Sequence, residues 1–211
     1  MIDCYSCGTT NGQRVVCMLE ETGLPYRPIW IDIARGEHRT PAFLAINPAG
    51  AIPVVVDHGS DGPLALSQSS AILLYLAEKS GMLLGAGEAR LRTIEWLQFA
   101  MSDMACASAS AFQVGRALGA GHAAQSFFLA RTKRFLDVLE HRLEGRAFVA
   151  DALSIADIAL YPNVILPVVA AMIDEGGAYP NIRRWRDRVA ARPGIARGIA
   201  IAPAPGSSNF K

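Results

Sequence analysis

Two cysteines near the start of the chain, Cys4 and Cys7, have the C-x-x-C spacing of a thiol–disulfide pair. The residues around Cys4 have the pattern of a short strand, in which three residues span about 10 Å, whereas the Cα atoms of a disulfide lie within about 7 Å. We therefore do not expect these cysteines to form a redox pair. Cys7 alone is a candidate for a reactive thiol, with ordinary packing as the alternative.

A second candidate for chemistry is the backbone at Ile52-Pro53, in the stretch 47–57. The β-branched run after Pro53 predicts a buried strand, and Pro53 should begin it because proline cannot donate a ladder hydrogen bond. An X-Pro bond at such a bend is a place where a cis peptide is retained. With a cis bond, the N–H and C=O of Ile52 would face outward and could pair with an extended peptide.

Other chemistry is excluded by spacing and charge. His58, His122 and His141 lack the spacing of metal ligands, so no metal is predicted. The glycines of 115–121 form no dinucleotide-binding fingerprint. With 20 basic and 19 acidic residues, the net charge of +1 provides no field that would attract nucleic acid or an acidic membrane surface. We expect a small ligand, no nucleic acid and no membrane.

The elements that must position these residues begin with a small α/β domain over residues 1–80. The apolar spacing predicts strands at 2–5, 27–31, 53–56 and 64–66, a helix at 13–22 and another ending near 80. The order is βαβ-ββα, with a hairpin turn at 57–63. The first strand, helix and strand require a right-handed crossover and a parallel pair.

After a linker at 81–87, the pattern changes to helices only, over residues 88–202. Long helices are predicted at 88–114, 123–144, 154–173 and 182–191. Ser154 and Asp157 form a capping box that begins the third of them. The last residues, 203–211, are rich in Pro, Gly, Ser and Asn and are predicted to be a mobile tail.

The cysteine content and the start of the chain bear on the compartment. Four cysteines, with neither a basic nor an apolar leader at the start, indicate a reducing compartment. The longest uncharged apolar run, 158–173, is shorter than the roughly 20 residues of a membrane helix and contains two prolines. We expect a cytoplasmic protein.

Several stretches together resemble the signatures of the cytosolic glutathione transferase family. They are Asn47-Pro48-x-Gly50-x-Ile52-Pro53-Val54-Val55, the run from Leu66 to Ala77, Ser154-Ile155-Ala156-Asp157, and Tyr179-Pro180-Asn181-Ile182-x-x-Trp185. The resemblance covers nearly the whole chain. It implies an α/β thioredoxin-like N-terminal domain, an all-α C-terminal helical domain, glutathione as ligand and a homodimer.

The opening is similar to that of bacterial nu-class members of the family, several of which reduce disulfides with glutathione. The similar residues are Thr9-Thr10-Asn11-Gly12-Gln13-Arg14 and Leu19-Glu20-Glu21-Thr22-Gly23-Leu24-Pro25-Tyr26. Thr10 stands where those members carry Pro. The resemblance implies a glutathione-dependent transferase or thiol–disulfide oxidoreductase acting on a small electrophile or a disulfide.

The same resemblance assigns roles to single residues. Thr9 and Asn11, at the start of the first helix, would donate hydrogen bonds to the sulfur of glutathione and lower its pKa. The remaining glutathione-binding residues implied are His38, Ile52, Pro53, Gln68 and Ser69. Ala51 departs from the Lys or Arg that family members often carry there.

Several alternatives remain open at this point. The loss of a basic residue at Ala51 keeps a non-catalytic ligand-binding or partner-binding member possible, and a glutathione-dependent isomerase is a third interpretation. Tyr5 could serve as a hydroxyl donor, although its place in a strand favours the core. Met104, Ser108 and Phe112 at helical spacing could border an apolar substrate pocket or pack in the core.

Overall fold

The structure, a computed structural model, describes residues 1–60 and 62–207. The chain divides into two compact units. Unit 1 comprises Met1–Met82 together with the segment from Ala191 onward, and unit 2 comprises Leu83–Ala190. The last helix therefore belongs to the first unit, whereas the sequence pattern groups residues 88–202 as one helical domain.

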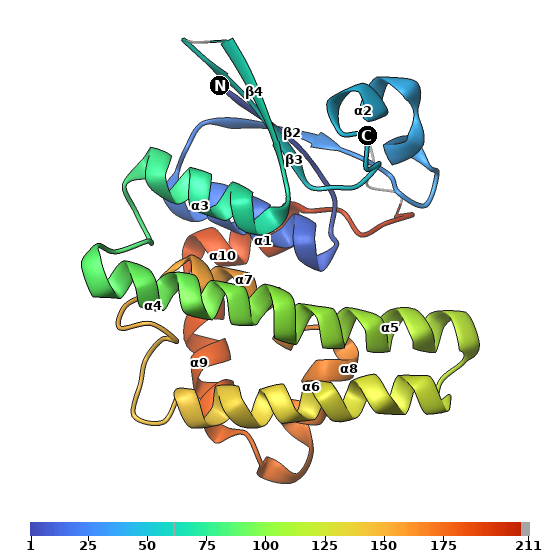
Figure 1. Ribbon diagram of the computed structural model, residues 1–211, viewed down its shortest axis with the longest axis vertical. Helices are drawn as coiled ribbons and strands as arrows, with labels where there is room; N and C mark the ends of the chain where they lie inside the picture. Colours follow the sequence, from blue (N-terminus) through green and yellow to red (C-terminus); the bar gives the residue numbers. More distant parts are fainter. Residues whose placement is uncertain (61, 208–211) are drawn as a thin grey trace. The chain divides into compact units, whose positions relative to one another are not determined.

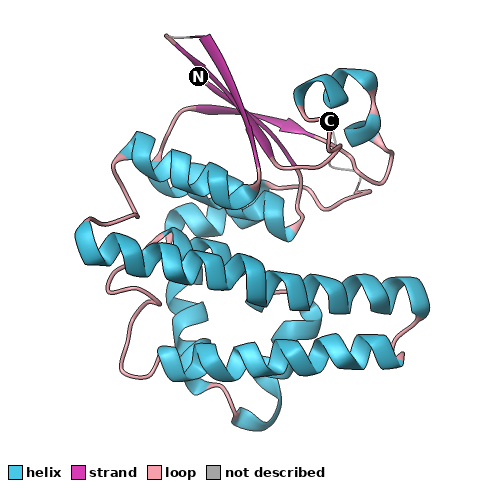
Figure 2. Ribbon diagram, viewed as in Figure 1, coloured by secondary structure: helices cyan, strands magenta, loops and turns pink. Residues whose placement is uncertain are grey.

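A mixed four-stranded sheet forms the centre of unit 1 (Figures 1 and 2). Its strands are β1 (Ile2–Ser6), β2 (Tyr26–Trp30), β3 (Val54–Gly59) and β4 (Gly62–Ser67), in the order β2-β1-β3-β4. β1 pairs in parallel with β2, and β3 is antiparallel to both β1 and β4. The predicted thioredoxin-like βαβ-ββα order is confirmed. Residue 61 of the predicted turn lies outside the described residues.

Two helices of unit 1 follow the strands that the sequence predicts they follow. α1 (Thr10–Thr22) comes after β1, and α3 (Ser69–Ser80) comes after β4. Each ends at a glycine with positive φ, Gly23 at 67° and Gly81 at 70°, a conformation that glycine adopts without the cost a Cβ would add. A short 3-10 turn, η1 (Glu37–Arg39), and α2 (Pro41–Ile46) link β2 to β3.

The helix α10 (Pro193–Ile201) packs against α1 at very short range (Figure 1). A Cβ added to Gly194 would lie 2.5 Å from Cα of Glu21, and one added to Gly198 would lie 2.6 Å from Cα of Cys17. Two glycines one turn apart thus let the helix backbones approach closely. Since both glycines are buried against α1, α10 is a structural part of unit 1.

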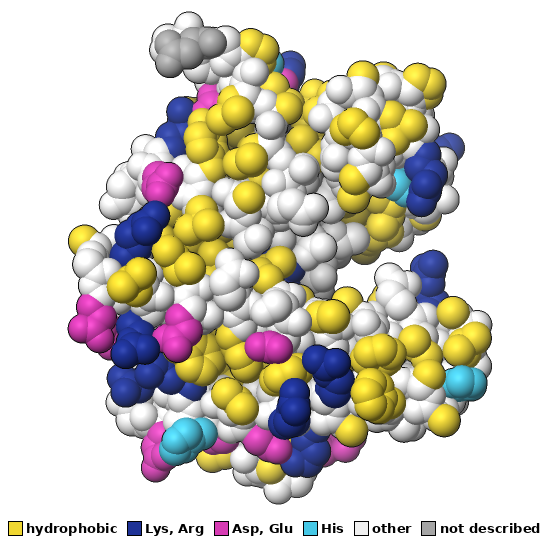
Figure 3. Space-filling view, in the orientation of Figure 1, with side chains coloured by type: hydrophobic (Ala, Val, Ile, Leu, Met, Phe, Trp, Pro, Cys, Tyr) yellow, Lys and Arg dark blue, Asp and Glu magenta, His cyan; other side chains and the backbone are white. Residues whose placement is uncertain are grey.

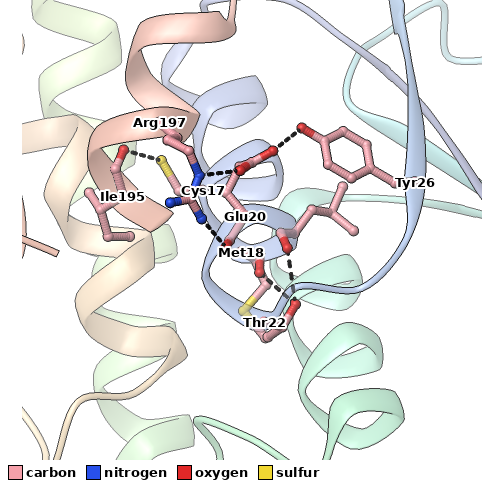
Figure 4. A network of polar contacts seen from close by, with 8 residues as sticks. Cys17, Met18, Glu20, Thr22, Tyr26, Ile195 and Arg197 are labelled. Atoms are coloured by element: carbon pink, nitrogen blue, oxygen red, sulfur yellow. Dashed lines mark hydrogen bonds and ion pairs between the residues drawn. The ribbon is translucent and has the colours of Figure 1, made fainter. Parts of the chain in front are cut away.

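Polar contacts fasten the same two helices (Figure 4). Nε of Arg197 donates to Oε2 of Glu20 at 2.8 Å, and the hydroxyl of Tyr26 donates to Oε1 of the same carboxylate at 2.7 Å. The thiol of Cys17 donates to the carbonyl of Ile195 at 3.7 Å. The Glu20 carboxylate therefore joins β2, α1 and α10.

The segment after α10 also lies against unit 1. The N–H of Gly8 donates to the carbonyl of Pro203 at 2.7 Å, and the N–H of Gly206 donates to Oδ1 of Asp32 at 3.2 Å. The mobility predicted for 203–211 stays a prediction, and residues 208–211 lie outside the described residues.

Unit 2 consists of helices. They are α4 (Gly87–Gln98), the π-helical segment η2 (Phe99–Ala105), α5 (Cys106–Leu118), α6 (Ala123–Arg142), α7 (Ile155–Val164), α8 (Pro167–Asp174), the short η3 (Glu175–Gly177) and α9 (Pro180–Ala190). The helix predicted at 88–114 contains the π-helical segment, which periodicity does not reveal. The helix predicted at 154–173 is broken, because Pro167 occupies the first position of α8 and cannot continue the hydrogen-bond ladder of α7.

The helix α7 forms the centre of unit 2, and all ten of its residues are buried. The predicted capping box is present, with Ser154 as the cap and Asp157 as its partner. The buried Asp157 carboxylate accepts from the N–H of Val149, from both the N–H and the hydroxyl of Ser154, and from Nε1 of Trp185, at 2.8 to 3.0 Å. This one carboxylate therefore ties the loop before α7 to α9.

The surface carries charges of both signs, and no single helix of the described chain is long and apolar enough to cross a membrane. The helices α7 and α8 would pass that test together, but they are bent by 88°. Figure 3 shows Lys and Arg side chains interspersed with Asp and Glu over the face it presents. This mixture agrees with the net charge of +1.

Candidate functional site

The register of the sheet brings the three predicted parts of the site to one edge of unit 1. Tyr5 of β1 pairs with Val54 of β3, and Val54 pairs with Ser67 of β4. The chain after β1, the chain before β3 and the chain after β4 therefore meet at this edge. These are the segments that contain Thr9, Ile52-Pro53 and Gln68-Ser69.

Thr9 is the N-cap of α1. Its backbone is extended, and its Oγ1 accepts from the N–H of Gly12 at 3.2 Å. A hydroxyl that accepts in this way still has its own proton to donate. The first turn of α1 contains no acidic residue. The start of this helix therefore offers N–H and O–H donors, and the helix dipole favours an anion there.

Asn11 lies in the first turn of α1 and is exposed. Its Oδ1 accepts a hydrogen bond from Nη1 of Arg14, which is fully buried. The oxygen end of the amide is thereby engaged within the protein, and the nitrogen end is available as a donor. Arg14 was not among the residues predicted for the site. The signal for it was a basic residue three positions after Asn11, on the same face of the helix.

Gly12 permits the close approach between α1 and the end of β1. A Cβ at this position would lie 2.0 Å from the carbonyl oxygen of Cys7 and 2.6 Å from Oγ of Ser6. Only glycine fits, so the glycine of the sequence motif has a steric reason. It holds the first turn of α1 against the loop that carries Thr9.

The peptide bond between Ile52 and Pro53 is cis, as the bend suggested. In the described chain, the N–H and C=O of Ile52 make no backbone hydrogen bond. The loop before them is held by the buried Asn47, whose Nδ2 donates to the carbonyl of Ala51 at 2.7 Å and whose Oδ1 accepts from the N–H of Ala49 at 3.2 Å. A fixed, unpaired backbone edge suits the main chain of a bound peptide.

Gln68 and Ser69 stand at the start of α3. Gln68 has φ 71° and ψ 111°, a left-handed conformation that is uncommon for a residue with a side chain and that concentrates at functional sites. Gln68 is exposed, Ser69 is buried, and no side chain caps the helix. The first N–H groups of α3 are therefore open to a carboxylate.

His38 lies in η1, and its Nδ1 is buried without a hydrogen-bond partner among the described residues. A buried polar atom without a partner is costly, and a ligand can provide the partner. Ala51 is exposed and has no group that could replace a basic side chain. Of the two residues considered for the far end of glutathione, only His38 offers a polar atom.

Cys4 in β1 and Cys7 just after it are not suited to redox chemistry. Cys4 and Cys7 are free thiols without solvent exposure. Burial raises the pKa of Cys4 to about 12 and that of Cys7 to about 11, so both remain protonated at neutral pH. Because the thiolate is the reactive form, this favours the packing alternative for Cys7. Tyr5 packs edge-on against Phe43, with ring centroids 6.2 Å apart, as its place in a strand indicated.

The three residues considered for a substrate pocket differ in exposure within unit 2. Met104 and Ser108 have no exposed surface, whereas Phe112 is 45% exposed. The hydroxyl of Ser108 donates to the carbonyl of Ala105 at 3.5 Å. Burial favours core packing for Met104 and Ser108, and Phe112 is the one of the three that solvent reaches.

No group of three or more His, Cys, Asp or Glu residues is placed to hold a metal ion within residues 1–60 and 62–207. The donors at the edge of the sheet are instead N–H and O–H groups. Such a set suits a small anionic peptide that carries carboxylates and a thiolate.

Comparison with known proteins identifies relatives of both parts of the chain. Residues 10–79 match the family described as "Glutathione S-transferase, N-terminal domain", and residues 109–198 match "Glutathione S-transferase, C-terminal domain". The disulfide-bond oxidoreductase YfcG of Escherichia coli is 35% identical over 96% of this chain and 96% of its own length.

Solved structures of relatives share the fold. A glutathione transferase family member from Pseudomonas fluorescens with two glutathione bound has a TM-score of 0.87 and 35% identity, covering 94% of this chain and 92% of that one. A glutathione transferase from Pseudomonas putida with one glutathione disulfide bound per subunit has a TM-score of 0.88 and 31% identity, covering 95% and 91%.

Proposed function

Since this chain belongs to the glutathione S-transferase family, we propose that it uses the thiol of glutathione to reduce disulfides. The observation that carries the proposal is the start of α1, where the Thr9 hydroxyl and the Asn11 amide offer donors beside a helix N-terminus without a carboxylate in its first turn. The Escherichia coli relative is a disulfide-bond oxidoreductase, which favours disulfides over other substrates.

The first task of such an enzyme is to ionise the thiol. A free thiol has a pKa near 8.5, so only a small fraction is thiolate at pH 7. A helix N-terminus stabilises an anion by about 0.3–1 kcal/mol, and a hydrogen bond to a charged group contributes about 1.5–3 kcal/mol. Each pKa unit corresponds to about 1.36 kcal/mol. One such hydrogen bond, from Thr9 or from Asn11, together with the helix dipole can therefore lower the thiol pKa by roughly 1 to 3 units.

The thiolate then attacks one sulfur of the substrate disulfide. A bond forms between the glutathione sulfur and that sulfur, the substrate S–S bond breaks, and the second substrate sulfur leaves as a thiolate that takes up a proton. A second glutathione thiolate attacks the mixed disulfide and releases the other substrate thiol. Two glutathione thiols are oxidised to one glutathione disulfide, and one substrate disulfide is reduced to two thiols.

The ligands of the two Pseudomonas relatives correspond to this scheme. Two glutathione molecules are the reductants that one turnover consumes, and glutathione disulfide is its oxidised product. We assign this chemistry to the present chain on the strength of its donors at α1, which supply the group that the first step requires.

The remaining residues would hold the tripeptide. The unpaired N–H and C=O of Ile52, fixed next to Pro53, pair with the cysteinyl main chain. The open N-terminus of α3, with Gln68 and Ser69, binds the γ-glutamyl carboxylate. His38 reaches the glycyl carboxylate through its buried Nδ1. Together these groups position the sulfur at Thr9 and Asn11.

The test compares two reactions in the wild-type protein and in Thr9→Ala and Asn11→Ala. We expect glutathione-dependent reduction of hydroxyethyl disulfide to fall by roughly 10- to 100-fold in each variant, because each loses one hydrogen bond to the thiolate. Thr9→Ser, which keeps the hydroxyl, is the matched control and should retain most of the rate. Equal rates in all four proteins would refute the roles of Thr9 and Asn11.

Conjugation of a small electrophile is the second activity to measure, with a chloronitrobenzene as substrate. The same thiolate performs both reactions, so a higher rate with the electrophile would reassign the substrate and keep the activation mechanism. Absence of both activities, with glutathione still bound in calorimetry, would favour the non-catalytic alternative that Ala51 keeps open. Absence of glutathione binding at millimolar concentration would remove the proposal as a whole.

The setting in which the protein works is part of the same proposal. We assign it to the cytoplasm because its four cysteines are free thiols, which a reducing compartment maintains. We also assign it a homodimeric state, on the strength of the family resemblance. Sedimentation at several protein concentrations tests this, and a constant monomer mass would contradict it.

A further inference from the structure

The amide of Asn11 can serve as a donor only in one of its two orientations. The side chain has a carbonyl oxygen that accepts and an NH2 group that donates, and a half-turn exchanges them. If the oxygen faced outward, it would repel a thiolate at the start of α1. The residue type at position 11 does not decide between the two orientations.

Arg14 decides between them. It lies three residues after Asn11, on the same face of α1, and its Nη1 donates to Oδ1 of Asn11. A guanidinium carries only donors. The reversed amide would place N–H groups against N–H groups, so the contact fixes the oxygen inward and leaves Nδ2 of the exposed Asn11 for a ligand.

The burial of Arg14 strengthens this effect. Its side chain is 0% exposed, so water does not compete for the contact. Burial lowers the pKa of Arg14 to about 10, which leaves the guanidinium charged at neutral pH. A charged donor on Oδ1 polarises the amide and makes the N–H groups at its other end stronger donors.

The neighbouring polar groups at the start of α1 do not orient the Asn11 amide in place of Arg14. The Thr9 oxygen is occupied by the N–H of Gly12, and Asp32 lies near the Cys7 thiol. Burial raises the pKa of Cys7 to about 11; hydrogen bonding from Thr9 acts against this shift, and Asp32 contributes in the same direction as burial. Cys7 therefore stays protonated over the range in which a bound thiol titrates.

We propose that Arg14 is the positioning residue for thiol activation: by holding the oxygen of the Asn11 amide, it presents the N–H groups of that amide to the sulfur of glutathione. This rests on the proposed function. It predicts that a buried residue without contact to the ligand controls the pKa of the bound thiol, and that it does so through Asn11 alone.

The experiment measures the pKa of bound glutathione from the ultraviolet absorbance of its thiolate, in a Cys106→Ser background. Cys106 is the exposed cysteine, whereas Cys4, Cys7 and Cys17 are buried with pKa values of about 12, 11 and 12 and contribute little signal. Calorimetry on each protein reports glutathione binding separately. If the wild-type protein does not bind glutathione, the proposed function fails; the positioning role is judged on proteins that bind.

We expect Arg14→Met and Asn11→Ala each to raise the pKa of the bound thiol by about 1 to 2 units. The double variant should show no larger shift than either single variant, because both break the same contact. Arg14→Lys, which retains a cationic donor, should restore most of the effect. Arg35→Met, at an exposed arginine of unit 1, is the matched control and should leave the pKa unchanged.

Two results would overturn the positioning role. One is an Arg14→Met protein that binds glutathione with the wild-type thiol pKa. The other is a double variant whose shift equals the sum of the two single shifts, which would mean independent effects.

If Arg14→Met does not fold, the positioning role is tested by the thiol pKa in Asn11→Asp and by NMR of the wild-type protein. The carboxylate introduced by Asn11→Asp would pair with Arg14 and preserve the helix but offers no N–H group, so the thiol pKa should rise at least as much as in Asn11→Ala. In the wild-type protein, the side-chain amide NMR signals of Asn11 should move on binding glutathione and much less on binding S-methylglutathione. An unchanged pKa, or equal movement with both ligands, would overturn the role.

Discussion

Two helices of unit 2, α7 and α9, and two helices of unit 1, α1 and α3, differ in what lies at their N-termini. In unit 2, the start of α7 is occupied by the Asp157 carboxylate, and the start of α9 by Glu140, whose oxygens accept from the N–H groups of Asn181 and Ile182 at 2.9 Å. In unit 1, neither α1 nor α3 has an acidic residue in its first turn. The N-terminus is thus closed by the chain's own carboxylates in α7 and α9 and has no such carboxylate in α1 and α3.

The difference shows what each unit contributes. A helix N-terminus attracts an anion wherever it occurs. Unit 2 uses this attraction to fasten its loops and helices, which stabilises the fold. Unit 1 leaves it for the thiolate and the carboxylate of the proposed ligand, so its open N-termini are available for binding.

The largest expected effect comes from opening a closed N-terminus. Asp157→Ala removes an acceptor for four hydrogen bonds and leaves buried donors without partners. We expect it to lower the free energy of unfolding by about 3–5 kcal/mol, measured by urea denaturation. Glu144→Ala, at an exposed carboxylate, is the control and should change stability by less than about 0.5 kcal/mol. A similar small loss for both variants would mean that the closed N-terminus contributes little.

A smaller loss is expected from displacing the open N-terminus of α1. Gly12→Ala places a methyl group against the carbonyl of Cys7 and forces the first turn of the helix away from β1. We expect a loss of about 1–3 kcal/mol in thermal or urea unfolding, together with weaker glutathione binding. Gly59→Ala, at a position where a Cβ meets nothing within 4 Å, is the control. If Gly12→Ala were destabilised but bound glutathione as tightly as the wild-type protein, the close packing at Gly12 would matter for stability and not for the proposed binding site.

The loss of folding stability at low pH tests the contribution of a carboxylate of unit 1, that of Asp3. A hydrogen bond from Arg27, with a second from His58, keeps the pKa of the buried Asp3 below its ordinary value of 3.8 despite burial. Because the folded-state pKa is depressed, the stabilisation is present above pH 3.8 and is lost as the pH falls through the folded value.

We therefore expect Asp3→Asn to flatten the dependence of unfolding on pH below about 4, measured by denaturation at successive pH values. Glu144→Gln is the control. It should leave that dependence unchanged, because the Glu144 carboxylate, just after the end of α6, is exposed to solvent. If Asp3→Asn lost stability at low pH in the same way as the wild-type protein, the Asp3 carboxylate would not contribute to the pH dependence of unfolding.

The smallest expected change in stability comes from closing the open N-terminus. Thr10→Asp introduces a carboxylate in the first turn of α1 and should add about 0.3–1 kcal/mol to the free energy of unfolding. The same carboxylate would repel the thiolate, so disulfide reduction should become slower and require higher pH. Thr10→Asn, which has the same shape without the charge, is the control. If Thr10→Asp were more stable and reduced disulfides at the wild-type rate, the open N-terminus of α1 would not be needed for the reaction.

Local patterns were sufficient to predict much of the fold and several elements of the site. The β-branched run after Pro53 predicted β3, the Ser154 and Asp157 spacing predicted the cap of α7, and Gly23 marked the end of α1. Each of these depends on residues close together in the chain, where spacing determines backbone geometry.

What could not be predicted depends on contacts between distant residues or on side-chain orientation. The pairing of α10 with α1 requires Gly194 and Gly198 to meet Glu21 and Cys17, more than 170 positions away in the chain. The orientation of the Asn11 amide depends on the burial of Arg14, which hydrophobic periodicity does not indicate for a charged residue.

The membership of α10 in unit 1 has a consequence for the synthesis of the chain. The surface of α1 that carries Cys17 and Glu21 remains without its partner until Gly194 and Gly198 have been added. At about 5–20 residues per second, the ribosome needs roughly 6 to 24 s to extend the chain from the end of α3 to the end of α10. The first unit to emerge is thus the last to be completed, and a chaperone that protects this nascent protein would find its binding site on the uncovered face of α1.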